Sequence, residues 1–158
     1  MPRKRKEQWR NGDVFTVPQR DGMRSIGQIL DTMMANVVTC AFYDIRCAPD
    51  CPPAQLSLSP DKLISCVSVA KWHLDSGAWE VVLRGQPLMV DREHWANERY
   101  RSQGWVGAIH YDPGIIEDFL DAFYGLVPWD DYHDPHYLDS LLVSPNKKPS
   151  NIVLKKRE

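Results

Sequence analysis

The sequence predicts a single α+β domain, in which a bent, mostly antiparallel β-sheet or small partial barrel carries an amphipathic helix and a short C-terminal helix. Three observations predict this fold class. Short apolar runs bounded by turn residues follow one another from residue 12 to residue 90. A strong helical period occupies residues 112–124. The 158 residues, 43% of them hydrophobic and 25% charged, have the size and composition of one globular domain.

The predicted strands are short and are separated by turns. Pro18 ends the first strand, and Gly22 can adopt the positive φ that a turn into the second one needs. Gly27 lies inside the second strand, where it predicts a bulge or the close approach of another group. The third strand is apolar without alternation, which is typical of a central position. Strands are expected at residues 14–17, 24–30, 37–43, 63–69, 79–83 and 105–110, with a proline-rich loop at 46–62.

Two helices are expected near the C-terminus. Asp112 is a good N-cap, Pro113 suits the first helical position, and Gly125 can end the helix. A second, shorter helix is expected to start at Asp134-Pro135. In the first helix the apolar residues fall on one face, Ile115, Ile116, Phe119, Leu120, Phe123 and Tyr124, and the acidic residues point the opposite way, Glu117, Asp118 and Asp121.

Charge divides the chain into a basic flexible arm at residues 1–10, an α+β domain at 11–144 and a basic tail at 145–158. No apolar run is long enough to span a membrane, and no apolar core follows the basic N-terminus as in a secretory signal. A cytoplasmic protein with reduced cysteines is therefore expected. Cys47 and Cys51 are spaced as C-x3-C, but no second close pair of ligands accompanies them, so free thiols are favoured and neither a metal nor another cofactor is expected.

The most unusual segment of the chain is residues 112–139. It holds eight carboxylates and no Lys or Arg, although the formal net charge of the whole chain is −2. The helix signals and aromatic residues within it favour a folded segment over a disordered acidic tail. Folded negative charge at this density can attract a basic partner.

Two segments of the sequence resemble the immunity protein 26 family of bacterial polymorphic toxin systems. One is GDVFTVPQRDGMRSIGQIL at residues 12–30, followed after a gap by AFYD. The other is IIEDFLDAFYGLVPWDDYHDPHYLDSLL at residues 115–142, whose ordered patterns F-x-x-A-F-Y-G-L-x-P-W-D and D-P-x-Y-L-D are the more specific. The two segments frame about 130 residues. Residues 47–101 carry no motif of the family.

The resemblance implies an intracellular protein that binds and neutralises a cognate toxin in bacterial contact-dependent inhibition, and it implies no enzymatic activity. The expected toxin is a nuclease, whose phosphate-binding cleft would present Lys and Arg to an acidic surface. Trp129 and Tyr132 are candidate anchors of the interface, although packing under its own loop is the favoured interpretation for Trp129. Simple helix caps are likewise favoured for Asp112 and Asp134, and the helix carboxylates can form a solvated face. The candidate partner-binding residues are Asp112, Glu117, Asp118, Asp121, Trp129, Asp130, Asp131, Tyr132, Asp134 and Asp139.

Two other classes of function fit less well. An enzyme could use His110, His133 and His136 among the nearby aspartates, but their spacing matches no established metal or catalytic pattern, and exposed loop histidines are the favoured reading. A small nucleic-acid-binding module could use the two basic termini together with a barrel-like sheet. The pI of about 6.2 argues against a dominant phosphate-binding face.

Overall fold

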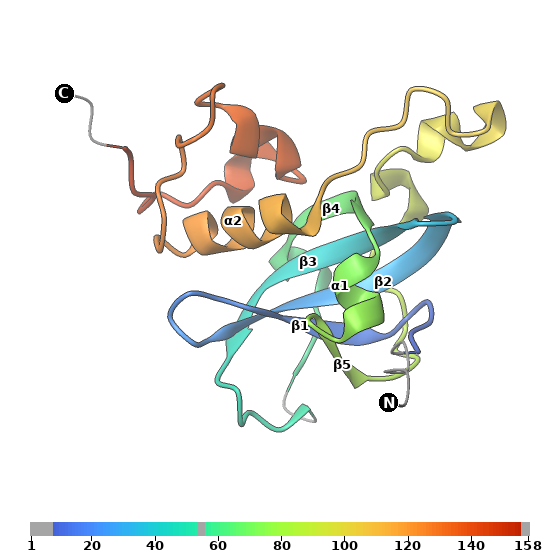
Figure 1. The fold of residues 1–158 in the computed structure, drawn as a ribbon, viewed down its shortest axis with the longest axis horizontal. Coiled ribbons are helices and arrows are strands. Elements are labelled where there is room, and N and C mark those ends of the chain that lie inside the picture. Colours follow the sequence, from blue (N-terminus) through green and yellow to red (C-terminus); the bar gives the residue numbers. More distant parts are fainter. Residues whose placement is uncertain (1–7, 54–55, 156–158) are drawn as a thin grey trace, which may run out of the picture.

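A computed structural model describes residues 8–53 and 56–155 and contains one antiparallel sheet of five strands (Figure 1). In the part of the chain that is described, the sheet does not close into a barrel, because β4 and β5 form its two edges. An antiparallel sheet with few helices confirms the predicted α+β fold class. In the spatial order β4-β3-β2-β1-β5, the strands are β4 Leu63–Ala70, β3 Val37–Cys47, β2 Arg24–Met34, β1 Val14–Pro18 and β5 Glu80–Leu83.

The sheet is bent because its pairing is repeatedly interrupted. The register shifts between Val14 and Phe15, at three places between β2 and β3, and once between β3 and β4; such bulges bend a strand and increase its twist. Gly27 has the role that its position predicts. A Cβ atom there would lie 2.5 Å from Cζ of Phe15, so only glycine lets the Phe15 ring cross β2.

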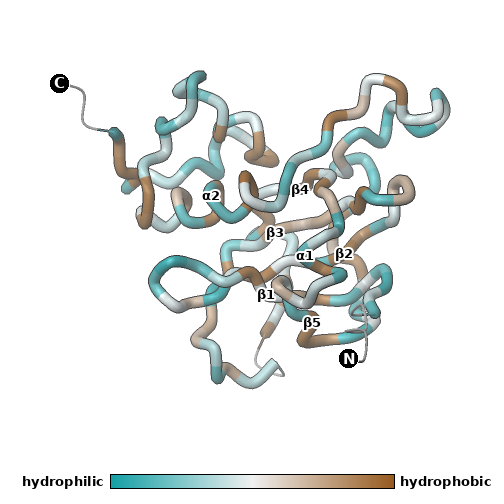
Figure 2. The backbone as a smooth tube through the Cα atoms, in the orientation of Figure 1, coloured by the Kyte–Doolittle hydropathy of each residue, from teal (hydrophilic) through white to brown (hydrophobic). Residues whose placement is uncertain are grey.

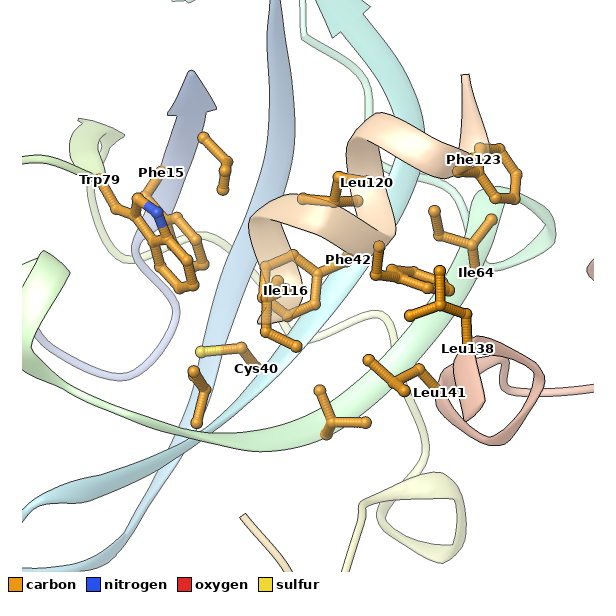
Figure 3. Close-up of a cluster of buried hydrophobic side chains, with 14 of the residues drawn as sticks. Phe15, Cys40, Phe42, Ile64, Trp79, Ile116, Leu120, Phe123, Leu138 and Leu141 are labelled. Atoms are coloured by element: carbon orange, nitrogen blue, oxygen red, sulfur yellow. The ribbon is translucent and has the colours of Figure 1, made fainter. Parts of the chain in front are cut away.

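One face of the sheet is covered by helix α2 (Pro113–Phe123) and by the C-terminal segment, which lie beside each other over β3 and β4 (Figure 1). Figure 3 shows Ile116 and Leu120 of α2 above Phe42 of β3, next to the stacked pair Phe15 and Trp79. All five side chains are fully buried. Each large side chain buried in this way contributes roughly 1.5–3 kcal/mol to folding, so this interface holds α2 firmly in place.

The opposite face of the sheet is covered by loops. Leu30 and Tyr43 pack there against Val90 and Trp95. Because both faces are covered, the residues of β1 from Val14 to Val17 are all buried, and strict alternation of buried and exposed residues is lost. Hydrophilic residues gather instead in connections such as the β1–β2 hairpin loop (Figure 2).

The remaining helices are short. Helix α1 (Trp72–Ser76), which the sequence pattern did not indicate, ends at Gly77 with φ 81°. The predicted C-terminal helix is present as one 3₁₀ segment, η5 (Tyr137–Leu141). The other 3₁₀ segments are η2 (Pro60–Lys62), η3 (Arg92–His94), η4 (Glu98–Gln103) and η6 (Pro145–Lys147).

The strand predicted at residues 105–110 is wrong. Trp105 and Gly107 have φ values of 68° and 91°, which interrupt an extended backbone. The side chain of Asn97 binds both the N–H and the C=O of Ile109, at 3.0 and 2.6 Å, so a strand ladder cannot use them. Tyr111, which follows this segment, does reach the edge of β4, in an isolated parallel bridge to Val69.

The two chain ends join the fold where they are described. In the predicted arm, residues 1–7 lie outside the described residues, and Trp9 donates its indole N–H to Asp75 at 2.9 Å. In the predicted tail, residues 145–155 pack on the loop that follows α2, and the backbone N–H of Trp129 donates to the C=O of Val153 at 2.8 Å. Among the described residues, no helix has the length and the apolar character that crossing a bilayer requires.

Candidate functional site

The candidate site is built on α2, whose start is fixed by its cap. Asp112 has an extended backbone, and its Oδ1 accepts a hydrogen bond from the backbone N–H of Gly114 at 2.8 Å. Asp112 is thus a helix cap, and its side chain also remains exposed. Since the apolar face of α2 is held on the sheet, the first two turns of the helix present Glu117 and Asp118 to the outside.

A shallow depression of about 710 Å³ runs along this side of the helix, and we call it the α2 groove. The β1–β2 hairpin and α2 form its walls, and Tyr132 also lines it. The groove contains five of the ten residues that the sequence analysis proposed for partner binding, Asp112, Glu117, Asp118, Asp121 and Tyr132, together with Pro18, Gln19, Arg20, Gly114 and Ile115.

Asp121 does not have the solvated position that the helical period predicted. Its side chain is buried, with 4% of the residue exposed. Gln19 donates its amide N–H to Asp121 Oδ1 at 3.3 Å, and Arg20 donates its Nε–H to Oδ2 at 3.1 Å. The amide of Gln19 also donates to the C=O of Leu120 at 3.1 Å. Asp121 therefore ties the hairpin to the helix, because the hairpin folds over the last turns of α2.

The other two helix carboxylates, Glu117 and Asp118, have partners but are less buried than Asp121. Tyr132 donates its O–H to Asp118 at 2.8 Å, while the guanidinium of Arg20 lies 3.8 Å from the same carboxylate. Burial, and then this bond to Asp118, raise the pKa of Tyr132 above its usual value. Glu117 lies 3.5 Å from Nε2 of His73. Both carboxylates are still half-exposed.

Trp129 is buried under its own loop, with 1% of the residue exposed, so the interpretation that it packs there is confirmed. Its role as an anchor of the interface stays a prediction. Its ring lies 5.7 Å from the Phe119 ring, and its indole N–H donates to Asp139 at 2.7 Å. Asp139 also pairs with Lys148 at 3.0 Å. Burial alone would raise the pKa of Asp139, but the hydrogen bonds from Trp129 and Lys148 outweigh it and hold the pKa below its usual value.

The basic tail pairs with the acidic loop. Lys155 lies with its Nζ 3.0 Å from Asp131, and its backbone N–H donates to Asp130 at 2.6 Å. Asp134 accepts from the backbone N–H of His136 at 2.9 Å and stays exposed, as a local cap does. The ten proposed residues thus divide into two groups: those that line the α2 groove, and loop residues that mostly pair within the chain.

Charged groups dominate the arrangement. Across the described residues, three possible metal ligands come within 4.8 Å of one another in one group only, Asp91, Glu93 and His94, which are all exposed. His110, His133 and His136 belong to no such group in the same part of the chain. The groove instead brings four carboxylates and one guanidinium together on a rigid helix and hairpin, an arrangement that can attract positive charge.

Comparison with protein-family models, curated proteins and solved structures finds no match to this chain. The resemblance to the immunity protein 26 family therefore stays a prediction, and the candidate site rests on its own geometry.

Proposed function

We propose that the protein is an immunity protein that binds a cognate bacterial toxin, of the nuclease class, and neutralises it. The α2 groove is the contact surface. One observation carries the proposal: along one side of a firmly held helix, Asp112 is exposed and Glu117 and Asp118 are half-exposed, so a basic surface can reach all three. The resemblance of residues 115–142 to the immunity family points the same way.

Charge is the physical basis of the recognition. A nuclease cleft that holds phosphate is lined by Lys and Arg, and an acidic surface of fixed shape attracts such a cleft over several ångströms. Complementary charge of this kind accelerates association by roughly 10–10³-fold and depends on salt. The protein acts stoichiometrically, by occupying a surface, and it acts in the cytoplasm, where the toxin would otherwise reach its target.

The internal pairs favour a smaller docking face than the whole acidic segment. Asp131 and Asp139 have lysine partners from the tail, and Asp121 is buried under Arg20. Breaking these pairs on binding would cost energy that a partner must offset. We therefore assign docking to the exposed carboxylates of the groove, and a supporting role to Asp121, Trp129 and Asp139.

The alternative function, nucleic-acid binding through the basic termini, has less support. The charges that it needs fall largely on residues 1–7 and 156–158, which lie outside the described residues. Lys148 and Lys155 already bind carboxylates of the chain itself. No observation in the described part favours this function over toxin binding.

The test is the rate of association with the toxin encoded beside this protein, measured by stopped-flow at several salt concentrations. Glu117→Lys reverses a groove charge without touching the Asp121 pair. Glu93→Lys is the matched control, because Glu93 is exposed and lies outside the groove and the change in net charge is the same. The proposal expects Glu117→Lys to slow association several-fold at low salt and to weaken its salt dependence. Equal rates for the two variants would show that the groove is not the contact surface.

A further inference from the structure

A pair of cysteines lies on the far side of the sheet, away from the α2 groove. Cys47 is the last residue of β3, and Cys51 follows in the proline-rich loop. The backbone N–H of Cys51 donates to the C=O of Ala48 at 2.9 Å, which closes a tight turn between the two cysteines. Both therefore line one pocket of about 250 Å³, whose opposite wall is formed by Thr16, Arg24 and Val82.

The two thiols differ in exposure. Cys47 is buried, with 8% of the residue exposed, and packs with Val14 and Ile26, whereas Cys51 is half-exposed at the edge of the same cluster. Burial raises the pKa of the Cys47 thiol, and the nearby Cys51 raises it further. The two side chains share one small pocket and one apolar cluster, and the Cys51 thiol lies 3.7 Å from the C=O of Pro52.

The other two cysteines, Cys40 and Cys66, are buried away from solvent. Burial raises the pKa of Cys40 well above its usual value and that of Cys66 to about 12. Because both are buried, whereas Cys51 is half-exposed, a reagent in solution reaches Cys51 first.

We propose that Cys47 and Cys51 form a dithiol that closes to an intramolecular disulfide by exchange with a low-molecular-weight disulfide. The thiolate of Cys51 attacks one sulfur of the reagent, forms a mixed disulfide and releases one thiolate. The thiolate of Cys47 then attacks Sγ of Cys51, forms the Cys47–Cys51 bond and releases the second thiolate. The reagent is reduced to two thiols, which take up the two protons that the cysteines lose, and the protein is oxidised by two electrons.

The order of attack follows from the geometry. The half-exposed Cys51 meets the reagent. Cys47 lines the same pocket and resolves the mixed disulfide within the same molecule, where effective concentrations are high. The ring that closes is short, so it removes little entropy from the unfolded chain and changes stability little. The site is thus a reversible modification site, independent of the proposed toxin binding.

The test treats the full chain under native conditions with oxidised glutathione, followed by alkylation and mass mapping of the tryptic peptide that spans residues 47–62. The proposal expects the peptide to lose about 2 Da, two hydrogen atoms, with two alkylation sites lost and both restored by excess reduced glutathione. Cys47→Ser should accumulate a stable mixed disulfide at Cys51. Cys51→Ser should react at least tenfold more slowly than the wild type.

Three results would overturn the proposal. One is a stable mixed disulfide at Cys51 in the wild-type chain, and another is no reaction at residues 47–62. The third is a disulfide that links two chains or involves Cys40 or Cys66. The wild-type map decides between these outcomes and the predicted one even if a variant fails to fold.

Discussion

The α2 groove and the acidic loop at residues 126–142 have similar charge in the sequence and different surroundings in the fold. In the groove, Asp112, Glu117 and Asp118 line an open depression. In the loop, Asp131 and Asp139 pair with Lys155 and Lys148 of the chain's own tail. Part of the negative charge is therefore paired within the protein and stabilises it. A count of carboxylates along a sequence overstates the negative surface that a partner can meet.

The largest change in stability is expected from a substitution in the acidic loop. Trp129→Ala removes a fully buried ring that packs on Phe119 and leaves Asp139 without its indole donor. We expect a loss of roughly 3–5 kcal/mol in the free energy of unfolding, as for other large-to-small substitutions in a core. Urea denaturation followed by fluorescence measures it. A loss below 1 kcal/mol would mean that Trp129 does not hold the loop on the core.

A second prediction separates the two kinds of carboxylate within the groove. Asp121→Ala leaves Gln19 and the Arg20 guanidinium without their acceptor in a buried site, and we expect it to cost about 1–3 kcal/mol. Glu117→Ala removes a half-exposed carboxylate beside His73 and should change stability by less than about 0.5 kcal/mol. Equal costs in chemical denaturation would contradict the buried position of Asp121.

A third prediction concerns pH and the loop. The pKa of Asp139 is below its usual value of 3.8, so the folded protein binds this proton less readily than the unfolded chain. The stabilisation is therefore complete above that usual value and is lost as pH falls through the lower, folded-state pKa. Because the carboxylate is partly exposed, we expect less than about 1 kcal/mol. NMR titration of the side chain should give the lowered pKa in the wild type and a return toward 3.8 in Lys148→Ala.

The last prediction concerns the tail lysine Lys155. Lys155→Ala breaks an exposed pair with Asp131, and such pairs contribute at most about 1 kcal/mol. Thermal unfolding should show a shift of a few degrees or less. A large destabilisation would mean that the tail, rather than the packed loop, fixes the acidic segment.

The sequence predicts the elements whose signals are local. The helix at residues 112–124 has a cap, an N-terminal proline and an apolar stripe, and it is present as α2 from Pro113 to Phe123. Gly27 predicts a close approach, and the Phe15 ring provides it. Each of these signals needs only neighbouring residues or the period of one element.

The parts that the sequence does not predict depend on contacts between distant residues. The burial of Asp121 comes from Gln19 and Arg20, about 100 positions earlier, and the hairpin sequence gives no sign that it folds over α2. The pairing of the tail with the loop has one signal in the sequence, the opposite charge of the two segments, and that signal does not reveal which residues meet. The strand expected at 105–110 is lost because Trp105 and Gly107 adopt positive φ, which an apolar pattern cannot reveal.

The most direct test of the central claim is an NMR titration of the isotopically labelled protein with its cognate toxin. If the groove is the contact surface, the largest shifts of amide signals fall at the start of α2, near Asp112, Glu117 and Asp118, and in the facing hairpin. Signals of the tail-paired loop around Asp131 and Asp139 should move little. Shifts confined to that loop, or to residues outside the groove altogether, would contradict this claim.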